Sequence, residues 1–123
     1  MSLPELLEQA LAIRGVTSAA IVGRDGQLVE GASSSGQDLS FISGLITMGM
    51  ASSRVLAELL GEGDITQTMI EFDQGPVLIT PLGQAPIGEG HVAVVTLKSS
   101  QDVGRARFGL RKLLPQMAEA TAS

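Results

Sequence analysis

The segment from Asp38 to Leu60 constrains the fold most, because its pattern predicts a long helix with two apolar stripes. The stripes lie about 100° apart around the helix axis, since adjacent residues of a helix are separated by that angle. One stripe is enough to pack a surface helix onto its own sheet. The alternative, burial of the second stripe within the same domain, is disfavoured because a small domain has little material left to cover it. We therefore expect a protein interface, for which a symmetric homodimer is the simplest arrangement.

Each face of this helix has an expected role. The stripe expected to face its own sheet consists of Leu39, Ile42, Ile46, Gly49, Ser53, Leu56 and Leu60. The stripe expected to face a partner consists of Phe41, Leu45, Met48, Ser52, Val55 and Leu59. The third face is small and mostly uncharged, and it consists of Ser40, Ser43, Gly44, Thr47, Ala51 and Arg54. Small residues on that face allow another helix or chain to come close.

Turn residues between apolar runs predict five strands in the rest of the chain. The pair Asp25-Gly26 is a strong hairpin signal between the first two strands. The run from Val92 to Val95 is almost continuously apolar, which is typical of a central strand covered on both faces. The expected strands are Thr17–Val22, Gln27–Gly31, Ile65–Phe72, Pro76–Thr80 and His91–Leu97.

Two further helices are expected near the ends of the sequence. The first covers Pro4–Arg14, and Ser2 can cap its beginning. The last begins after a cap at Ser99 or Ser100, and Pro115 is expected to kink or end it.

The element order α-β-β-α-β-β-β-α, with short connections, predicts an α/β (α+β) fold. We expect a mainly antiparallel five-stranded sheet flanked by three helices. The length of 123 residues fits a single domain over residues 1–123, with a frayed tail from about residue 119.

Residues suited to catalysis are scarce. The chain has no cysteine and one histidine, His91, so a zinc site would rest on this residue and on carboxylates such as Glu89. No G-x-S-x-G turn is present for a serine nucleophile. The string from Gly88 to Ala93 is similar to a dinucleotide-binding loop, but it precedes a strand, whereas such a loop follows a strand and opens a helix. We therefore expect no catalytic residue, no cofactor, no metal and no enzymatic activity; a hydrolase using His91 or Glu89 is an alternative without a nameable reaction.

Charge and hydropathy argue against nucleic-acid and membrane partners. The formal net charge is −5, which opposes sequence-independent binding to phosphate backbones. The longest apolar stretch contains Arg54 and Glu58, and a charge inside a lone membrane span is expensive. The N-terminus lacks the basic start and apolar run of a signal peptide, so the expected location is the cytoplasm.

Acidic and basic residues gather in different parts of the sequence. The acidic group is Glu58, Glu62, Asp64, Glu71 and Asp73, and the basic group is Lys98, Arg105, Arg107, Arg111 and Lys112. Two solvated faces are the simplest interpretation, and two sites for oppositely charged partners are the alternative.

The element order, the hairpin stretch Ala20–Val29 and the long helix with small residues together resemble the Roadblock/LC7 family, which is profilin-like in build. Within this family, the sequence most resembles the bacterial branch that is similar to the gliding-motility protein MglB. The resemblance covers nearly the whole chain, and its firmest point is the Asp25-Gly26 turn between apolar strands.

This resemblance implies a homodimer that pairs the middle helices, Asp38–Leu60, and joins the sheets through the strand Ile65–Phe72. Thr68 and Ile70 would then join the partner-facing stripe in the interface. The family also implies that the paired helices bind a Ras-like small GTPase, with no catalytic residue contributed by the domain itself. The expected contacts to that GTPase are Ser43, Thr47, Ala51 and Arg54.

A small-molecule sensor of PAS or GAF type is the alternative function, because such modules also combine a curved sheet with helices. Its pocket wall would be the strand His91–Leu97 and the loop Pro81–Gly90. Binding pockets are usually lined by apolar and aromatic side chains. Aromatic residues make up only 2% of this sequence, which argues against a sensor.

Overall fold

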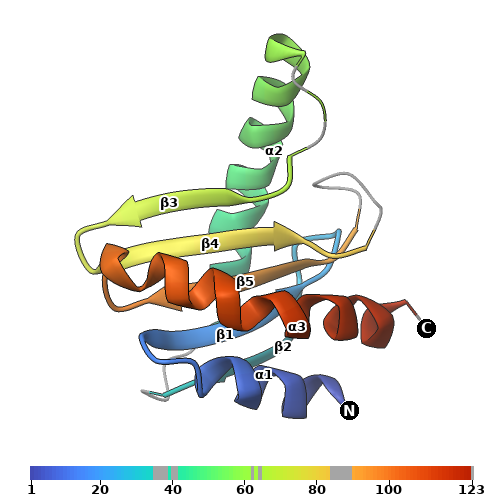
Figure 1. The fold of residues 1–123 in the computed structure, drawn as a ribbon. Helices are drawn as coiled ribbons and strands as arrows, with labels where there is room; N and C mark the ends of the chain where they lie inside the picture. Colours follow the sequence, from blue (N-terminus) through green and yellow to red (C-terminus); the bar gives the residue numbers. More distant parts are fainter. Residues whose placement is uncertain (35–38, 40–41, 62, 64, 84–89, 123) are drawn as a thin grey trace.

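The structure is a computed structural model that describes residues 1–34, 39, 42–61, 63, 65–83 and 90–122. Within these residues the elements follow the expected order (Figure 1). The helices are α1 (Leu3–Leu11), α2 (Ile42–Leu60) and α3 (Val103–Thr121), and the short 3-10 helix η1 (Ser100–Asp102) leads into α3. The strands are β1 (Val16–Val22), β2 (Leu28–Ser33), β3 (Thr68–Phe72), β4 (Gly75–Pro81) and β5 (Val92–Leu97).

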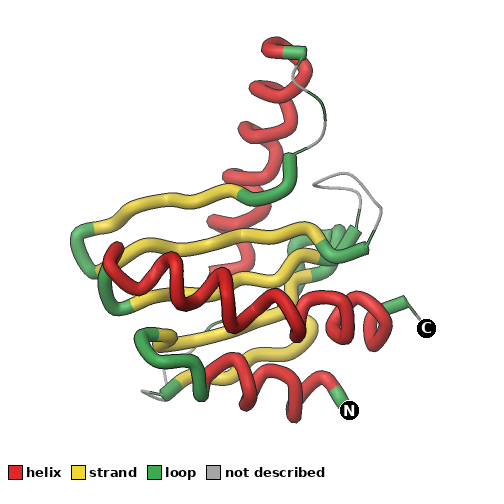
Figure 2. The backbone as a smooth tube through the Cα atoms, viewed as in Figure 1, coloured by secondary structure: helices red, strands yellow, loops and turns green. Residues whose placement is uncertain are grey.

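The five strands form one sheet in the order β2-β1-β5-β4-β3, and every pairing is antiparallel (Figure 2). This confirms the predicted sheet. The hairpin between β1 and β2 turns at Asp25 and Gly26, where Gly26 has a φ of 83° and the backbone N–H of Gln27 donates to Asp25 Oδ1 at 3.1 Å. Strand β5 lies at the centre, and β2 and β3 form the two edges.

Helices cover both faces of the sheet. Helices α1 and α3 lie on one face, and α2 lies on the other (Figure 1). The alternation of side chains along β5 explains the two cores: Ala93 and Val95 pack towards α1 and α3, whereas Val92 and Val94 pack towards α2. All four side chains are buried, as expected for a central strand.

Helix α1 begins with a reciprocal cap. Ser2 Oγ accepts from the backbone N–H of Glu5 at 3.4 Å, and Glu5 Oε1 accepts from the backbone N–H of Ser2 at 3.3 Å. The side-chain hydrogen bond from Ser2 favours the charged form of Glu5 and so lowers the pKa of this carboxyl. The helix ends at Leu11 rather than at the expected Arg14, and Gly15, with a φ of 96°, turns the chain into β1.

The sequence led us to expect that Pro115 would kink or end the last helix. The structure shows that Pro115 does not end it. Helix α3 continues through it to Thr121. Leu113 and Met117, on either side of the proline, are both buried in the core against α1. Packing of these two side chains favours a continuous helix despite the backbone hydrogen bond that proline cannot donate.

Helix α2 crosses the sheet and runs on past the edge strand β3 (Figure 1). Its 19 residues span about 28 Å at a rise of about 1.5 Å per residue. The helix therefore has a part that lies on the sheet and a part that lies beyond it. Within the described residues, no helix combines the length and the apolar character needed to cross a membrane.

Candidate protein-interaction surface

The part of α2 that lies on the sheet packs closely against it. Ile46 and Met50 are buried in the core formed with β1, β4 and β5. Gly49 lies against β3, because a Cβ built at this position would be 3.8 Å from Ile70 Cδ1. Further along the helix, Ser53 reaches the edge strand, with its Oγ 3.4 Å from Thr68 Oγ1. The sheet thus covers α2 only as far as about Ser53.

The part of α2 beyond the sheet carries large exposed apolar side chains. We call this part the apolar tip; its residues are Val55, Leu56, Leu59 and Leu60, and their exposed fractions are 55%, 56%, 79% and 61%. Apolar side chains clustered at one place on a surface are characteristic of a protein–protein contact, whereas single exposed ones are common. The apolar tip is therefore the first component of a candidate interaction surface.

Strand β3 provides the second component. It pairs with β4 on one side only, so its outer edge faces away from the sheet. Phe72 and Met69, one on each face of this strand, are 54% and 44% exposed. An open strand edge can add a strand from another chain through backbone hydrogen bonds. The end of α2 that carries the apolar tip runs past this edge (Figure 1).

A shallow groove of about 290 Å³ joins these two components. It is formed between α2 and the segment that leads into β3, and it is lined by Ser53, Leu56, Ala57, Leu60, Gly63, Ile65, Gln67 and Thr68. Most of these side chains are apolar or small. The groove therefore suits an apolar segment of another protein better than a charged ligand.

The structure places the sequence-predicted interface residues in two different environments. Ser52, Val55 and Leu59 are exposed on α2, whereas Thr68 and Ile70 are half-buried because their side chains face α2 of the same chain. Phe41 and the side chains of Leu45 and Met48 lie outside the described part of the structure.

Two of the four residues expected to contact a GTPase are described. Ala51 and Arg54 are exposed on α2. The side chains of Ser43 and Thr47 lie outside the described part of the structure. Arg54 and Glu58 are the charged side chains of α2, so most of the exposed side chains that the structure describes on this helix are uncharged.

Sequence reasoning placed Leu56 and Leu60 in the stripe facing their own sheet, and it did not select Phe72. All three are exposed beside the β3 edge. Periodicity identifies the side of the helix correctly, but it does not reveal that the sheet ends before Leu56. The available signal was the length of the helix, whose 19 residues span about 28 Å.

The residues considered for chemistry are not arranged as a catalytic or metal site within the described residues. His91 is half-buried just before β5, and Glu89 lies outside the described part of the structure. No group of three potential metal ligands occurs among the residues that the structure describes. Of the proposed sensor pocket wall, strand β5 is packed on both faces against the helices, and residues 84–89 of the loop lie outside the described part of the structure.

Comparison with protein families agrees with this arrangement of elements. The model of the Roadblock/LC7 domain matches residues 3–96 of the sequence. The chain belongs to the Roadblock/LC7 family. The match covers α1, β1 to β4, α2 and β5 as far as Thr96, and it includes both components of the candidate surface. Among curated protein sequences, none matches this member of the family.

Solved structures of the family share its fold. A structure described as MglB with a tetrameric arrangement superposes with a TM-score of 0.81 at 17% identity, covering 96% of this chain and 86% of that one. MglB from Myxococcus xanthus gives a TM-score of 0.78 at 18% identity, with 97% and 96% covered. A Roadblock/LC7 domain from Streptomyces avermitilis gives 0.72 at 18% identity over 100% of both chains. The fold class and the resemblance to the MglB-like branch are thereby confirmed.

Proposed function

We propose that this protein is a non-enzymatic homodimeric regulator or scaffold that binds a Ras-like small GTPase. The observation that carries the proposal is the apolar tip of α2 beside the open edge of β3. Neither component is covered by the described part of the chain, and a second copy covers both at once. In this dimer the β3 edges join, and each apolar tip packs under the partner's sheet beside the partner's α2.

The exposed apolar area supports an obligate rather than a weak contact. Each of the four side chains of the apolar tip is more than half exposed, and Phe72 at the end of β3 adds an aromatic ring. Burial of such a side chain contributes about 1.5–3 kcal/mol relative to leaving it in water. Joining two β3 strands adds backbone hydrogen bonds across the interface. Both contributions favour a dimer over a monomer.

Family membership and the MglB-like fold support a GTPase as the protein that binds this dimer. The proposed contact surface is the outer face of the paired α2 helices, with Ser43, Thr47, Ala51 and Arg54. In this proposal the domain acts by binding and reshaping the GTPase and contributes no catalytic residue of its own. We propose that the chain is a single domain over residues 1–123 that works in the cytoplasm, without nucleic acid or membrane as a partner.

Co-purification tests the GTPase assignment. Ras-like GTPases encoded in the same genome are loaded with GDP or with a non-hydrolysable GTP analogue, and each is passed over the immobilised dimer. We expect one GTPase to be retained preferentially in one nucleotide state. The variant Arg54→Glu is expected to weaken this binding at least ten-fold while leaving the dimer intact, since Arg54 is exposed on α2. Failure of every GTPase to bind in either state would overturn the assignment.

A further inference from the structure

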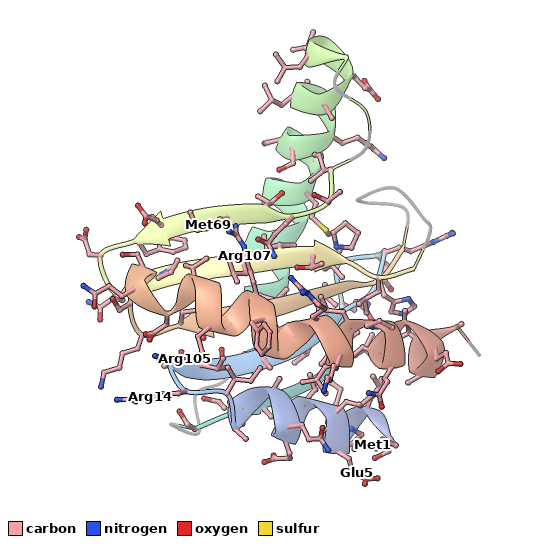
Figure 3. The ribbon with its side chains drawn as sticks, viewed as in Figure 1. Met1, Glu5, Arg14, Met69, Arg105 and Arg107 are labelled. Carbon is pink, nitrogen blue, oxygen red and sulfur yellow. The ribbon has the colours of Figure 1, made fainter. Side chains whose placement is uncertain are left out.

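On the sheet face covered by α3, a side chain from the C-terminal part of the sequence reaches the β3 edge. Arg107 Nε donates to Gln67 Oε1 at 2.7 Å, and Gln67 Nε2 donates in turn to Thr80 Oγ1 at 3.3 Å. Figure 3 shows Arg107 extending from α3 towards β3, beside Met69. The two hydrogen bonds hold the guanidinium group above the beginning of the outermost strand.

Among the described residues, Arg107 hydrogen-bonds to the neutral amide of Gln67, and none of them balances its positive charge. Among the described residues, the ion pair with N···O below 4 Å joins Arg105 to Asp102 at 3.4 Å, and it lies away from the β3 edge (Figure 3). The groove around Arg107 has a volume of about 520 Å³ and is open to solvent; it is lined by Thr66, Gln67, Thr80, Arg107, Leu110, Arg111 and Leu114. None of these lining residues is acidic. A carboxylate supplied from outside would complete the group.

The chain's own acidic residues lie on the same face of β3. Thr68 and Ile70 point towards α2, because their side chains approach Ser53 and Gly49. Side chains alternate along a strand, so Gln67, Met69 and Glu71 point to the opposite face, where α3 lies. Glu71 is exposed, and Asp73 follows in the exposed turn between β3 and β4.

Joining two β3 edges by a two-fold axis brings these acidic groups to Arg107. Directly opposed residues of an antiparallel pair share a face, so a residue on the α3 face is opposed by another residue on that face. With the axis at Met69, Gln67 is opposed by Glu71 of the partner subunit. With the axis at Ile70, the middle of the strand, Gln67 is opposed by the partner's Asp73, and the partner's Glu71 is its diagonal neighbour, within about 8 Å. The partner's Glu71 is thus within reach of Arg107 in both registers.

We propose that Arg107 forms an ion pair with Glu71 of the partner subunit across the joined β3 edges, and that this pair makes the interface selective for a second copy of this chain. The inference rests on the proposed homodimer. In this arrangement, Arg107 on α3 of one subunit pairs with Glu71 on β3 of the partner subunit, and not with Glu71 of its own chain. A partner with a neutral or basic residue in place of Glu71 leaves Arg107 without a carboxylate and is disfavoured.

A charge swap tests the pairing. The dimer dissociation constant is measured by sedimentation equilibrium for the wild type, Arg107→Glu, Glu71→Arg and the double variant. Each single variant is expected to raise the dissociation constant about ten-fold, because two symmetry-related pairs are lost and replaced by like charges. The double variant restores opposite charges and is expected to return to within about three-fold of the wild type. The two single-variant penalties should both shrink in high salt.

Lys112→Glu is the matched control, because it makes the same charge change on the same helix. Lys112 is exposed and lies about 140° around the α3 axis from Arg107, so it does not face β3. Its dissociation constant is expected to equal that of the wild type, and circular dichroism checks that every variant is folded. Failure of the dimer and failure of the ion pair can be distinguished. If the wild type is a monomer, the proposed dimer itself is overturned. If the wild type is a dimer but Arg107→Glu does not weaken it, or the double variant does not restore it, only the ion pair is overturned.

Discussion

The variant Leu59→Glu is expected to run as a monomer in light scattering at concentrations where the wild type is a dimer. Leu59 is the most exposed side chain of the apolar tip, at 79%. In the proposed dimer it is buried, so the substitution places an unpaired carboxylate in an apolar interface. This costs at least about 3 kcal/mol, which corresponds to a dissociation constant more than a hundred-fold higher. The stability of the isolated domain should be almost unchanged, since Leu59 contributes nothing to either core.

Phe108→Glu provides the control for this variant. Phe108 is 73% exposed, so it undergoes the same change from an exposed apolar side chain to a carboxylate. It lies on α3, on the face of the sheet opposite α2, and Arg111 Cζ lies 5.9 Å from its ring centroid. We expect this variant to remain a dimer. If both variants dimerise like the wild type, the apolar tip is not the dimer interface; if both dissociate, exposure alone rather than position determines the effect.

The sequence predicts the order of elements and the central strand because these depend on local patterns. Asp25 and Gly26 need only their own backbone geometry to form a hairpin. The run from Val92 to Val95 needs only its continuous apolar character to indicate burial on both faces. The structure contains both the hairpin and the buried central strand, because tertiary packing and local sequence preference favour the same conformation at these positions.

Boundaries set by tertiary packing are not visible in the same patterns. The periodicity of α2 groups Leu56 and Leu60 with Ile46, yet only Ile46 is buried. The difference arises from where the sheet ends, which is determined by the strand order β2-β1-β5-β4-β3 rather than by any residue of the helix. Pro115 is the converse case, since packing of its neighbours overrides a local preference to end the helix.

The contact between Arg107 and Gln67 is a third case. Forty residues separate the two side chains in sequence, and no spacing rule connects them. The sequence shows only that acidic and basic residues gather in different segments. The fold is needed to show that Arg107 from the basic group lies at the same edge and on the same sheet face as Glu71 from the acidic group.

The variant Gly75→Ala is expected to lower the melting temperature by roughly 10 °C or more, corresponding to a loss of about 3 kcal/mol. Gly75 begins β4 at the end of the turn that follows β3, and its φ is 126°, a conformation that residues with a Cβ rarely adopt. A Cβ built there overlaps the backbone carbonyl oxygen of Leu97, at the end of β5. Because backbone atoms of a central strand cannot give way easily, the hairpin of β3 and β4 must shift as a unit.

Gly83→Ala is the control that distinguishes the steric overlap at Gly75 from the cost of placing a residue with a Cβ at a positive φ. Gly83 also has a positive φ, 74°, but a Cβ built there meets no atom of the described residues within 4 Å, so only the backbone cost of about 1–2 kcal/mol applies. Thermal unfolding followed by circular dichroism should therefore show a clearly larger loss for Gly75→Ala, and equal losses would contradict the close approach to Leu97. The same measurement bears on assembly. A displaced β3 no longer presents its edge beside the apolar tip, so Gly75→Ala should weaken the dimer as well, whereas Gly83→Ala should leave it intact.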